Sequence, residues 1–445
     1  MPGSEIKPSA NPRAMRIRKR CDLRAQPRRA RGRRYWILKD PVALQYFQLR
    51  DEEYFLWRQL DGNRSLEDIR QAFEQEFAPR RLAIRQLHAF IAQLHADGLV
   101  LADAADQGQE LQTRGDTARK RGMAAAAVNL LAIRFRGIDP HRGLRWLYGY
   151  VGWMFSPGWI ACCLALMAAA VVLCLTQFDT LQARLPRMES FFTVRNMLAL
   201  ATVLAVTKVL HELGHGLALT HFGGECHELG VMLLVFTPCL YCNVSDAWML
   251  PSKWQRVAIS AAGMFVELTL AAMATFLWWY SQPGVFNSLC LNVMLVCSLS
   301  TLLFNGNPLL RYDGYFILSD LMEVPNLQKQ SSDVIRQTLS RWFLDLSPRD
   351  PLPTPDIRPY WLGLYGLAAT AYRWVVLASI LWFMYQALKP HGLAIVAELG
   401  GAFLACGWFA APLAAAAAFA RDPWRAQGAN WPRAILLTTF LGAFL

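Results

Sequence analysis

Charged side chains are scarce in this chain of 445 residues. Only 18% of the residues are Asp, Glu, Lys or Arg, whereas 54% are hydrophobic. Soluble globular domains carry about 25% charged residues, so this composition argues against a soluble protein. The length also exceeds that of one ordinary domain. The shortage of charge therefore predicts an integral membrane protein.

The sequence also lacks a disulfide framework and a cleaved secretory signal. Its ten cysteines are scattered, several within apolar stretches, which indicates reduced thiols. Cys239 and Cys242 have a spacing seen in metal sites, but no second C-x-x-C accompanies them, so packing thiols are the favoured interpretation. No apolar core follows the start early enough for a signal peptide, which leaves the N-terminus on the cytoplasmic side.

Acidic residues are rare at the beginning of the chain. Residues 1–34 hold 12 Lys or Arg against Glu5 and Asp22, which accounts for +10 of the net charge of +12. We predict a basic disordered tail over residues 1–34. A lipid-surface anchor is the alternative, and nucleic acid is an unlikely partner.

Six apolar stretches are long enough to cross about 30 Å of hydrocarbon, which takes roughly 20 helical residues. They lie at 158–178, 196–220, 257–281, 286–304, 364–388 and 392–420. A last apolar run, 434–445, is too short to cross, so the chain either is truncated at Leu445 or ends half-buried. The predicted fold is mainly α: a polytopic transmembrane helical bundle of six spans plus an incomplete seventh.

The distribution of Lys and Arg tests this topology. If the N-terminus is cytoplasmic, the connecting segments on the cytoplasmic side of the membrane hold most of the basic residues, as the positive-inside rule requires. We therefore predict a multi-pass protein with a cytoplasmic N-terminus, in contact with the lipid bilayer. The inner (plasma) membrane of a bacterium is the predicted location.

Residues 35–103 are predicted to form a small α+β domain of winged-helix-like type. Two β-rich stretches, YWILKDP and VALQYFQL, precede three helical ones, and LVLAD closes the segment. Asp51 is placed to cap the first helix, and Ser65 with Asp68 forms a capping signature for the second. The order of elements and the segment WRQLDGNRSLEDI resemble those of the PqqD-like peptide-recognition domains. The resemblance implies a peptide ligand added as a strand to the sheet edge; a plain packing module is the alternative.

The remaining boundaries follow from changes in composition. Residues 104–156 are predicted to be a linker followed by an interfacial segment rich in Arg, Trp and Tyr. Residues 157–325 form the predicted membrane core, and 326–445 a cytoplasmic loop and the C-terminal membrane helices. The apolar segment between the second and third spans is expected to re-enter beside the core as an edge strand or gate.

The second predicted span contains HELGH at 211–215. On a helix, His211 and His215 project from one face and can share a metal ion. Glu212, beside them, can act as a general base toward a metal-activated water. Ionisable groups inside an apolar span are costly and usually mark function, so metal binding is favoured over a structural polar cluster.

Asp313 is the candidate third ligand. Asn305, Asn307 and Pro308 interrupt the fourth span before it, and irregular backbone at membrane depth is tolerated where it lines a cavity. Asp313-Gly314 alone is equally compatible with a simple turn.

These two motifs, in this order on separate helices, resemble the site-2 protease family of intramembrane zinc metalloproteases. That family has H-E-x-x-H on one helix and N-x-x-P-x-x-x-L-D-G on a later one; here Tyr312 replaces the Leu. The resemblance implies zinc (Zn2+) as cofactor, His211, His215 and Asp313 as ligands, and Glu212 as the catalytic base. Asn305 and Asn307 are predicted substrate or auxiliary residues.

A third family pattern, A-G-P-x-x-N, departs from the family here. Met264 and Glu267 replace its Pro and Asn. Glu267 either contacts the substrate backbone, neighbours Lys208 or serves as a structural partner. The departure concerns substrate handling rather than the metal.

The sequence thus predicts a membrane-embedded zinc metalloendopeptidase that hydrolyses peptide bonds within or next to the bilayer. Its substrate would be a peptide or a membrane protein. Two alternatives stay open: a processing component of a modified-peptide maturation or export system, and a non-proteolytic membrane scaffold or transporter accessory with a structural zinc site.

Overall fold

The structure is a computed structural model of the whole chain. It describes residues 17–30, 33–41, 43, 45–102, 132–135, 137–186, 193–234, 237–344, 359–392, 394–395 and 398–402. The chain forms two compact units: Met1–Cys162 with Lys208–Ile259, and Cys163–Thr207 with Ser260–Leu445.

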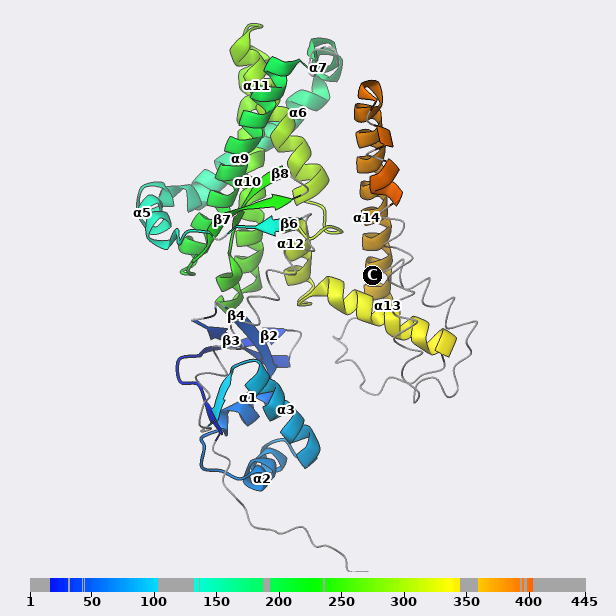
Figure 1. The fold of residues 1–445 in the computed structure, drawn as a ribbon. Coiled ribbons are helices and arrows are strands. Elements are labelled where there is room, and N and C mark those ends of the chain that lie inside the picture. The colour runs from blue at the N-terminus through cyan, green and yellow to red at the C-terminus, as the bar shows by residue number, and fades with distance from the viewer. Residues whose placement is uncertain are drawn as a thin grey trace, which may run out of the picture. The chain divides into compact units, whose positions relative to one another are not determined.

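The first unit begins with a small α+β domain, which is blue in Figure 1. Strands β2 (Arg24–Ala30), β3 (Arg33–Asp40) and β4 (Gln45–Arg50) form an antiparallel sheet in that order. Helices α1 (Asp51–Arg58), α2 (Leu66–Glu76) and α3 (Ile84–Ala96) follow, and β5 (Val100–Ala102) closes the domain. The core is apolar, and its members include Leu38, Trp57, Ile69, Leu87 and Leu94. The two expected β stretches, the three helices and the closing strand are therefore confirmed.

Residues 17–30 correct the prediction of a disordered basic tail over residues 1–34. β1 (Ile17–Lys19) pairs antiparallel with β5, and β2 pairs with β3. The basic side chains here find acidic partners: Arg20 Nη1 donates to Asp40 Oδ2 at 2.6 Å, and Arg20 Nη2 to Asp22 Oδ2 at 2.6 Å. Strand pairing satisfies the backbone and the carboxylates hold the guanidinium, so this segment is ordered despite its charge.

Two helix starts were predicted from capping residues. Ser65 is confirmed as the cap of α2, with its hydroxyl accepting from the Asp68 N–H at 3.2 Å and the Asp68 carboxylate accepting from the Ser65 N–H at 3.0 Å. Asp51 is not the cap of α1, because the helix begins at Asp51 itself and Arg50 precedes it as N-cap. Instead, Asp51 Oδ1 accepts from the Trp36 indole N–H at 2.8 Å.

The rest of the first unit combines a small sheet with helix segments. β6 (Ala132–Arg134), β7 (Leu229–Leu234) and β8 (Thr237–Cys242) pair antiparallel in that order. α5 (His141–Val151), the short helices η1 (Gly152–Phe155) and η2 (Ser245–Met249), the end of α9 (Val194–His221) and the start of α10 (Lys253–Tyr280) complete it. The segment between the second and third spans thus contains a β-hairpin.

The second unit is helical in its described part. It contains α6 (Pro157–Thr176) from Cys163 onward, α7 (Phe178–Arg184), α11 (Val285–Leu299), α12 (Asp313–Leu321), α13 (Leu327–Leu344), α14 (Pro359–Leu388) and η4 (Lys389–His391), with the remaining parts of α9 and α10. α11 continues as one stretch of π-helix, η3 (Ser300–Asn305), and helical structure then stops until Asp313. The predicted break after the fourth span is therefore present.

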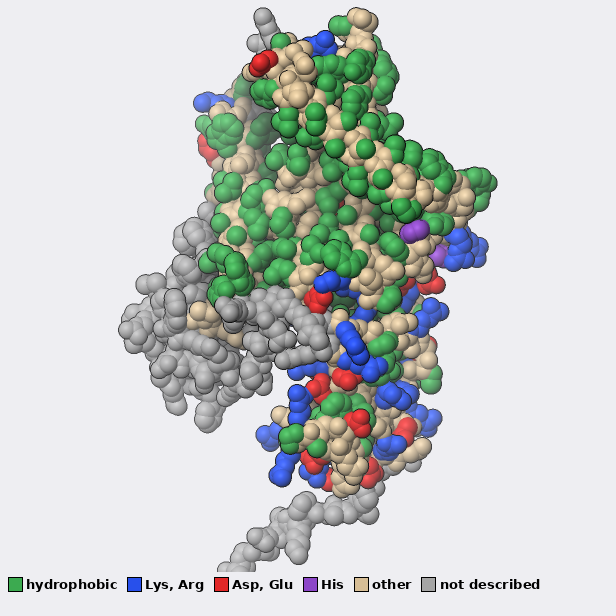
Figure 2. Space-filling view, turned by 180° about the vertical axis from the view of Figure 1, so that it is seen from behind, with side chains coloured by type: hydrophobic (Ala, Val, Ile, Leu, Met, Phe, Trp, Pro, Cys, Tyr) green, Lys and Arg blue, Asp and Glu red, His purple; other side chains and the backbone are tan. Residues whose placement is uncertain are grey.

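Among the described residues, five helices are long and apolar enough to cross a membrane. They are Pro157–Thr176, Val194–His221, Lys253–Tyr280, Val285–Asn305 and Tyr360–Gln386, which correspond to the first five predicted spans. The predicted sixth span, 392–420, lies largely outside the described residues, and the incomplete seventh, 434–445, lies wholly outside them. Figure 2 shows mainly hydrophobic side chains on the visible face of these helices, while the small α+β domain displays most of the charged ones. The chain is a multi-pass membrane protein by these criteria.

Candidate metal centre

The two histidines of HELGH converge as predicted. Both lie on α9 in the first unit and are buried, with 4% and 5% of the residue exposed for His211 and His215. Their Nε2 atoms are 3.1 Å apart, and their rings are nearly perpendicular. Two nitrogens that each lie about 2.0 to 2.1 Å from a tetrahedral zinc ion are roughly 3.3 Å apart. The pair therefore fits two positions of such a site.

The backbone of α10 orients one of these rings. His215 Nδ1 lies 2.7 Å from the carbonyl oxygen of Ile259, a residue with no exposed surface. Because a carbonyl only accepts, Nδ1 is the protonated nitrogen and Nε2 presents its lone pair. A hydrogen bond of this kind is what fixes the tautomer of metal-binding histidines.

The end of β8 orients Glu212. The Cys242 N–H donates to Glu212 Oε2 at 2.8 Å. Gly216, one turn further along α9, permits the close approach of α5, since an added Cβ would lie 2.9 Å from Leu144 Cδ1. The carboxylate is thus placed beside the histidine pair by two elements of the same unit.

The thiol of Cys242 contacts another cysteine of the first unit. Its Sγ lies 3.3 Å from the Sγ of Cys226, which is fully buried. The side chain of Cys239 is outside the described residues. The favoured interpretation of Cys242 as a packing thiol agrees with this contact, although its partner was not foreseen.

Asp313 belongs to the second unit, where it is the first residue of α12. The next residue, Gly314, is buried against the preceding loop: an added Cβ would meet the Gly306 carbonyl oxygen at 2.5 Å and the Asn307 carbonyl carbon at 3.0 Å. The Asp313 backbone is therefore held close to this loop.

Glu267 anchors the other end of that loop. It is 1% exposed, and its Oε2 accepts from Thr301 Oγ1 at 2.6 Å and from Asn305 Nδ2 at 3.0 Å. Asn307 Oδ1 accepts from the Leu309 N–H at 2.9 Å and so forms a local turn. Of the three roles weighed for Glu267, these contacts favour the structural partner. Substrate contacts of Asn305, Asn307 and Glu267 stay predictions.

Sequence reasoning missed a polar cluster in the first unit, where the α+β domain meets the membrane core. Lys39 Nζ, at the end of β3, donates to Asp246 Oδ1 of η2 at 2.6 Å and to Glu225 Oε2 at 3.1 Å. Tyr46 donates to Asp246 at 3.0 Å, and Arg28 donates to the Trp248 carbonyl oxygen. A lysine at a strand end gives no sequence signal that its partner lies some 200 residues away.

The electrostatics of this cluster follow from its contacts. The hydrogen bond from Lys39, and a second from His227, lower the pKa of Glu225 to about 2. Burial and the neighbouring Asp246 carboxylate raise the pKa of the Tyr46 hydroxyl. At neutral pH, Glu225 is therefore an anion and Tyr46 a neutral hydrogen-bond donor.

Comparison with known proteins gives two similarities. Residues 35–100 match the family model "Coenzyme PQQ synthesis protein D (PqqD)". The chain is also 32% identical over 111 residues to the "Putative peptide zinc metalloprotease protein YydH" of Bacillus subtilis (strain 168). That match covers 25% of this chain and 42% of the relative, so the chain spans less than half the length of that protein. No solved structure matches the chain.

The N-terminal domain is accordingly a PqqD domain, as its resemblance implied. The chain joins this domain to helices suited to a membrane, and it shares sequence similarity with a protein named as a zinc metalloprotease.

Proposed function

We propose that this protein is a membrane-embedded zinc metallopeptidase that acts on peptides. The observation that carries the proposal is the buried pair of His211 and His215, whose Nε2 atoms converge on a candidate membrane helix. His215 presents its Nε2 lone pair toward His211, because its Nδ1 donates to the Ile259 carbonyl oxygen. The name of the similar Bacillus protein supports the same chemistry.

The ligand set we propose is His211, His215 and Asp313. Each of the three can offer one ligand atom, an imidazole nitrogen from either histidine and a carboxylate oxygen from Asp313. Two imidazole nitrogens and a carboxylate oxygen are ligands that zinc prefers in catalytic sites, where a fourth position stays open. Gly314 and Glu267 position the segment that carries Asp313, and Ile259 orients His215.

Glu212 is the general base in this proposal. Zinc, when bound, would supply Lewis acidity toward a water molecule and the scissile carbonyl. The Cys242 N–H holds Glu212 Oε2, and we assign Oε1 as the atom that takes the proton of the attacking water. Glu212 then passes this proton to the nitrogen of the leaving amine, so that the carboxylate is regenerated.

Peptides are the proposed substrate class. The PqqD domain presents β2 and β4 as the edges of its sheet, and a peptide can bind to a sheet edge through backbone hydrogen bonds. Lys39 and Tyr46 of this domain contact Asp246, four residues after Cys242. A peptide on the domain would therefore be held by the unit that contains Glu212. This arrangement favours a role in processing a peptide during its maturation or export over cleavage of arbitrary membrane proteins.

The proposal is tested on the full chain purified in detergent and reconstituted in lipid. Zinc content is measured by elemental mass spectrometry, and cleavage by mass spectrometry of candidate precursor peptides. We expect about one zinc per chain, loss of zinc in His211→Ala, and retained zinc with cleavage reduced roughly 10²- to 10⁴-fold in Glu212→Gln. His88→Ala, on the exposed face of α3, is the control and should retain both.

Two outcomes decide against the proposal. Equal cleavage by Glu212→Gln and the parent would remove the catalytic assignment. The parent and Glu212→Gln could both contain full zinc and yet cleave no precursor peptide or membrane-protein substrate. That result would favour the scaffold with a structural zinc site.

A further inference from the structure

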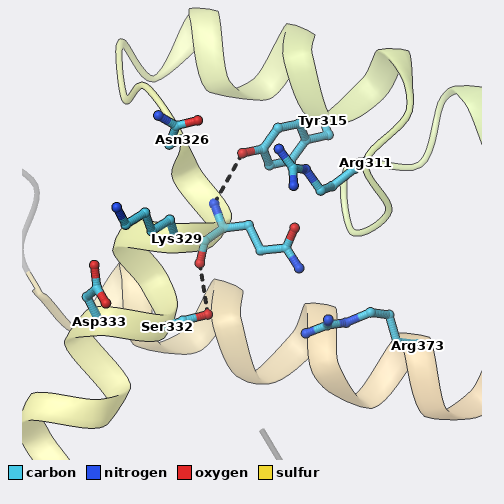
Figure 3. Close-up of a pocket in the computed structure, with 8 residues that line it drawn as sticks. Arg311, Tyr315, Asn326, Lys329, Ser332, Asp333 and Arg373 are labelled. Atoms are coloured by element: carbon cyan, nitrogen blue, oxygen red, sulfur yellow. Dashed lines mark hydrogen bonds between the residues drawn. The ribbon is translucent and has the colours of Figure 1, made fainter. Parts of the chain in front are cut away.

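A cavity of about 300 Å³ lies among three helices of the second unit (Figure 3). Its wall comes from the loop before α12, from α12 itself, from the beginning of α13 and from the middle of α14. Its lining includes the side chains of Arg311, Tyr315, Gln328, Lys329, Asp333 and Arg373. None of these six is needed for the metal centre proposed above.

The wall of this cavity is built on a packed core. Tyr315, Leu327 and Leu362 are buried together and join α12, α13 and α14. At Gly366 the last two helices approach so closely that an added Cβ would lie 2.6 Å from Ile335 Cδ1 and 3.2 Å from Ser331 Cβ. Figure 1 shows α13 running across the end of α14 that begins at Pro359. The polar groups of the cavity are therefore held by tightly packed helices.

Positive charge dominates the cavity. Arg311, Lys329 and Arg373 line it, and Asp333 is the one acidic residue among the lining side chains. Within the described part of the chain, no carboxylate forms an ion pair with any of these three cations. Arg311 stacks over the ring of Tyr315, with 5.8 Å between its guanidinium carbon and the ring centroid. The lining thus has a net positive charge.

Two polar atoms at this cavity are buried without a hydrogen-bond partner among the described residues: Arg373 Nε, a donor, and Gln328 Oε1, an acceptor. Arg373 Nη2 donates only weakly, to Thr370 Oγ1 at 3.3 Å. Buried donors and acceptors are nearly always satisfied in proteins, so these atoms indicate a bound group that both accepts and donates hydrogen bonds.

The surroundings indicate where such a group comes from. Arg373 is the one charged residue of α14 between Pro359 and Leu388, and α14 is a candidate membrane span. The same helix exposes apolar side chains on either side of Arg373, with Leu367 45% and Val375 60% exposed. The half of α14 before Arg373 packs at Gly366 on α13, a helix that is not among the candidate membrane spans, whereas the half after Arg373 carries no charge before Lys389. Arg373 therefore lies where a polar helix meets an apolar stretch of α14, a position that suits a lipid phosphate.

We propose that this cavity binds the headgroup of a glycerophospholipid. Arg311 and Arg373 hold the phosphate, because planar guanidinium groups donate two hydrogen bonds to its oxygens, and Lys329 adds a charge at the rim. Gln328 Oε1 and Asp333 accept from the hydroxyl or ammonium group of the headgroup alcohol. The lipid tails lie along the apolar surface of α14. The basic pockets of membrane proteins bind anionic headgroups in this manner.

The experiment measures phospholipid kept by the full chain after exhaustive washing in a phosphorus-free detergent. Lipid phosphorus per chain is determined, and the lipid is identified by native mass spectrometry. The test variant is Arg311→Gln with Arg373→Gln. The matched control is Arg195→Gln with Lys389→Gln, which removes two exposed charges that do not line the cavity. The unfolding temperature is recorded for every variant. If the double variant does not fold, Lys329→Gln replaces it as the test variant, because Lys329 is exposed.

We expect the parent and the control to keep the same lipid and the test variant to bind it roughly 10- to 100-fold more weakly, because it lacks the charged donors that hold the phosphate. Rebinding from vesicles should be stronger for phosphatidylglycerol or phosphatidylethanolamine than for phosphatidylcholine, whose headgroup has no donor. Equal lipid in the test variant and the control would overturn the proposal. Equal competition by inorganic phosphate would replace it with a soluble-anion site, and displacement only by an acidic peptide would replace it with a peptide site.

Discussion

Lys39 of the PqqD domain and Asp246 of the membrane core form a buried ion pair, with 2.6 Å between Nζ and Oδ1 and side-chain exposures of 4% and 8%. Asp246 also accepts from the Tyr46 hydroxyl at 3.0 Å and from the Glu225 N–H at 2.8 Å. Charges are buried in proteins when they are paired and hydrogen-bonded, and here every partner comes from the first unit. The contact fixes the PqqD domain on the segment that follows β8.

We expect Lys39→Met to release the PqqD domain from the core. The substitution leaves Asp246 as a buried charge without its cation, which costs about 3 to 5 kcal/mol. Hydrogen exchange of η2 and β3 should rise. Arg34→Met is the matched control, because its partner Asp51 is 3.9 Å away and both side chains are about half exposed. Adding Asp246→Leu to Lys39→Met should restore part of the protection; unchanged exchange in Lys39→Met would contradict the prediction.

The same contact should weaken in acid. The pKa of Glu225 is lowered to about 2, mainly by the hydrogen bond from Lys39. A depressed carboxyl pKa stabilises the folded state fully above the ordinary value of 4.5 and loses this contribution as the pH falls toward 2. The difference in unfolding temperature between the parent and Glu225→Gln should therefore be constant from pH 7 to about 5.5 and shrink below about 4.5. A difference that grows in acid would contradict the assignment.

Gly314→Ala should disturb the loop that carries Asp313. Its Cβ would lie 2.5 Å from the Gly306 carbonyl oxygen, a backbone atom that cannot turn away as a flexible side chain can. Overpacking of this kind costs about 1 to 3 kcal/mol. We expect a lower unfolding temperature and reduced zinc content. Gly363→Ala on α14 is the control, since an added Cβ there meets nothing within 4 Å. Normal zinc in Gly314→Ala would show that the loop does not position a ligand.

Glu267 is expected to act through its acceptor oxygen rather than through its charge. In Glu267→Gln the amide oxygen can still accept from Thr301 and Asn305, whereas in Glu267→Leu both buried donors lose this acceptor, at about 1 to 3 kcal/mol each. Thermal unfolding and zinc content should therefore decrease much more in the Leu variant than in the Gln variant. Equal losses in the two variants would instead indicate that the negative charge itself is required.

The sequence by itself determined the features that depend on local geometry. Helical periodicity alone places His211 and His215 one turn apart on a shared face, and hydrophobic length alone predicts the five membrane helices that the structure describes. The Ser65 capping box and the break after Asn305 are likewise predicted by residues that are neighbours in the sequence. Each of these features needs only a few consecutive side chains.

Only the tertiary structure decided how the candidate residues are held. The partners of His215 and Glu212 are the Ile259 carbonyl and the Cys242 N–H, and every residue except proline offers such a carbonyl and N–H. Basic residues 17–30 looked unstructured because pairing with β5 and β3 is a long-range event. The Lys39–Asp246 pair spans 207 positions and depends on how two domains pack. Residue identity therefore predicted the chemistry, while packing selected the partners that orient it.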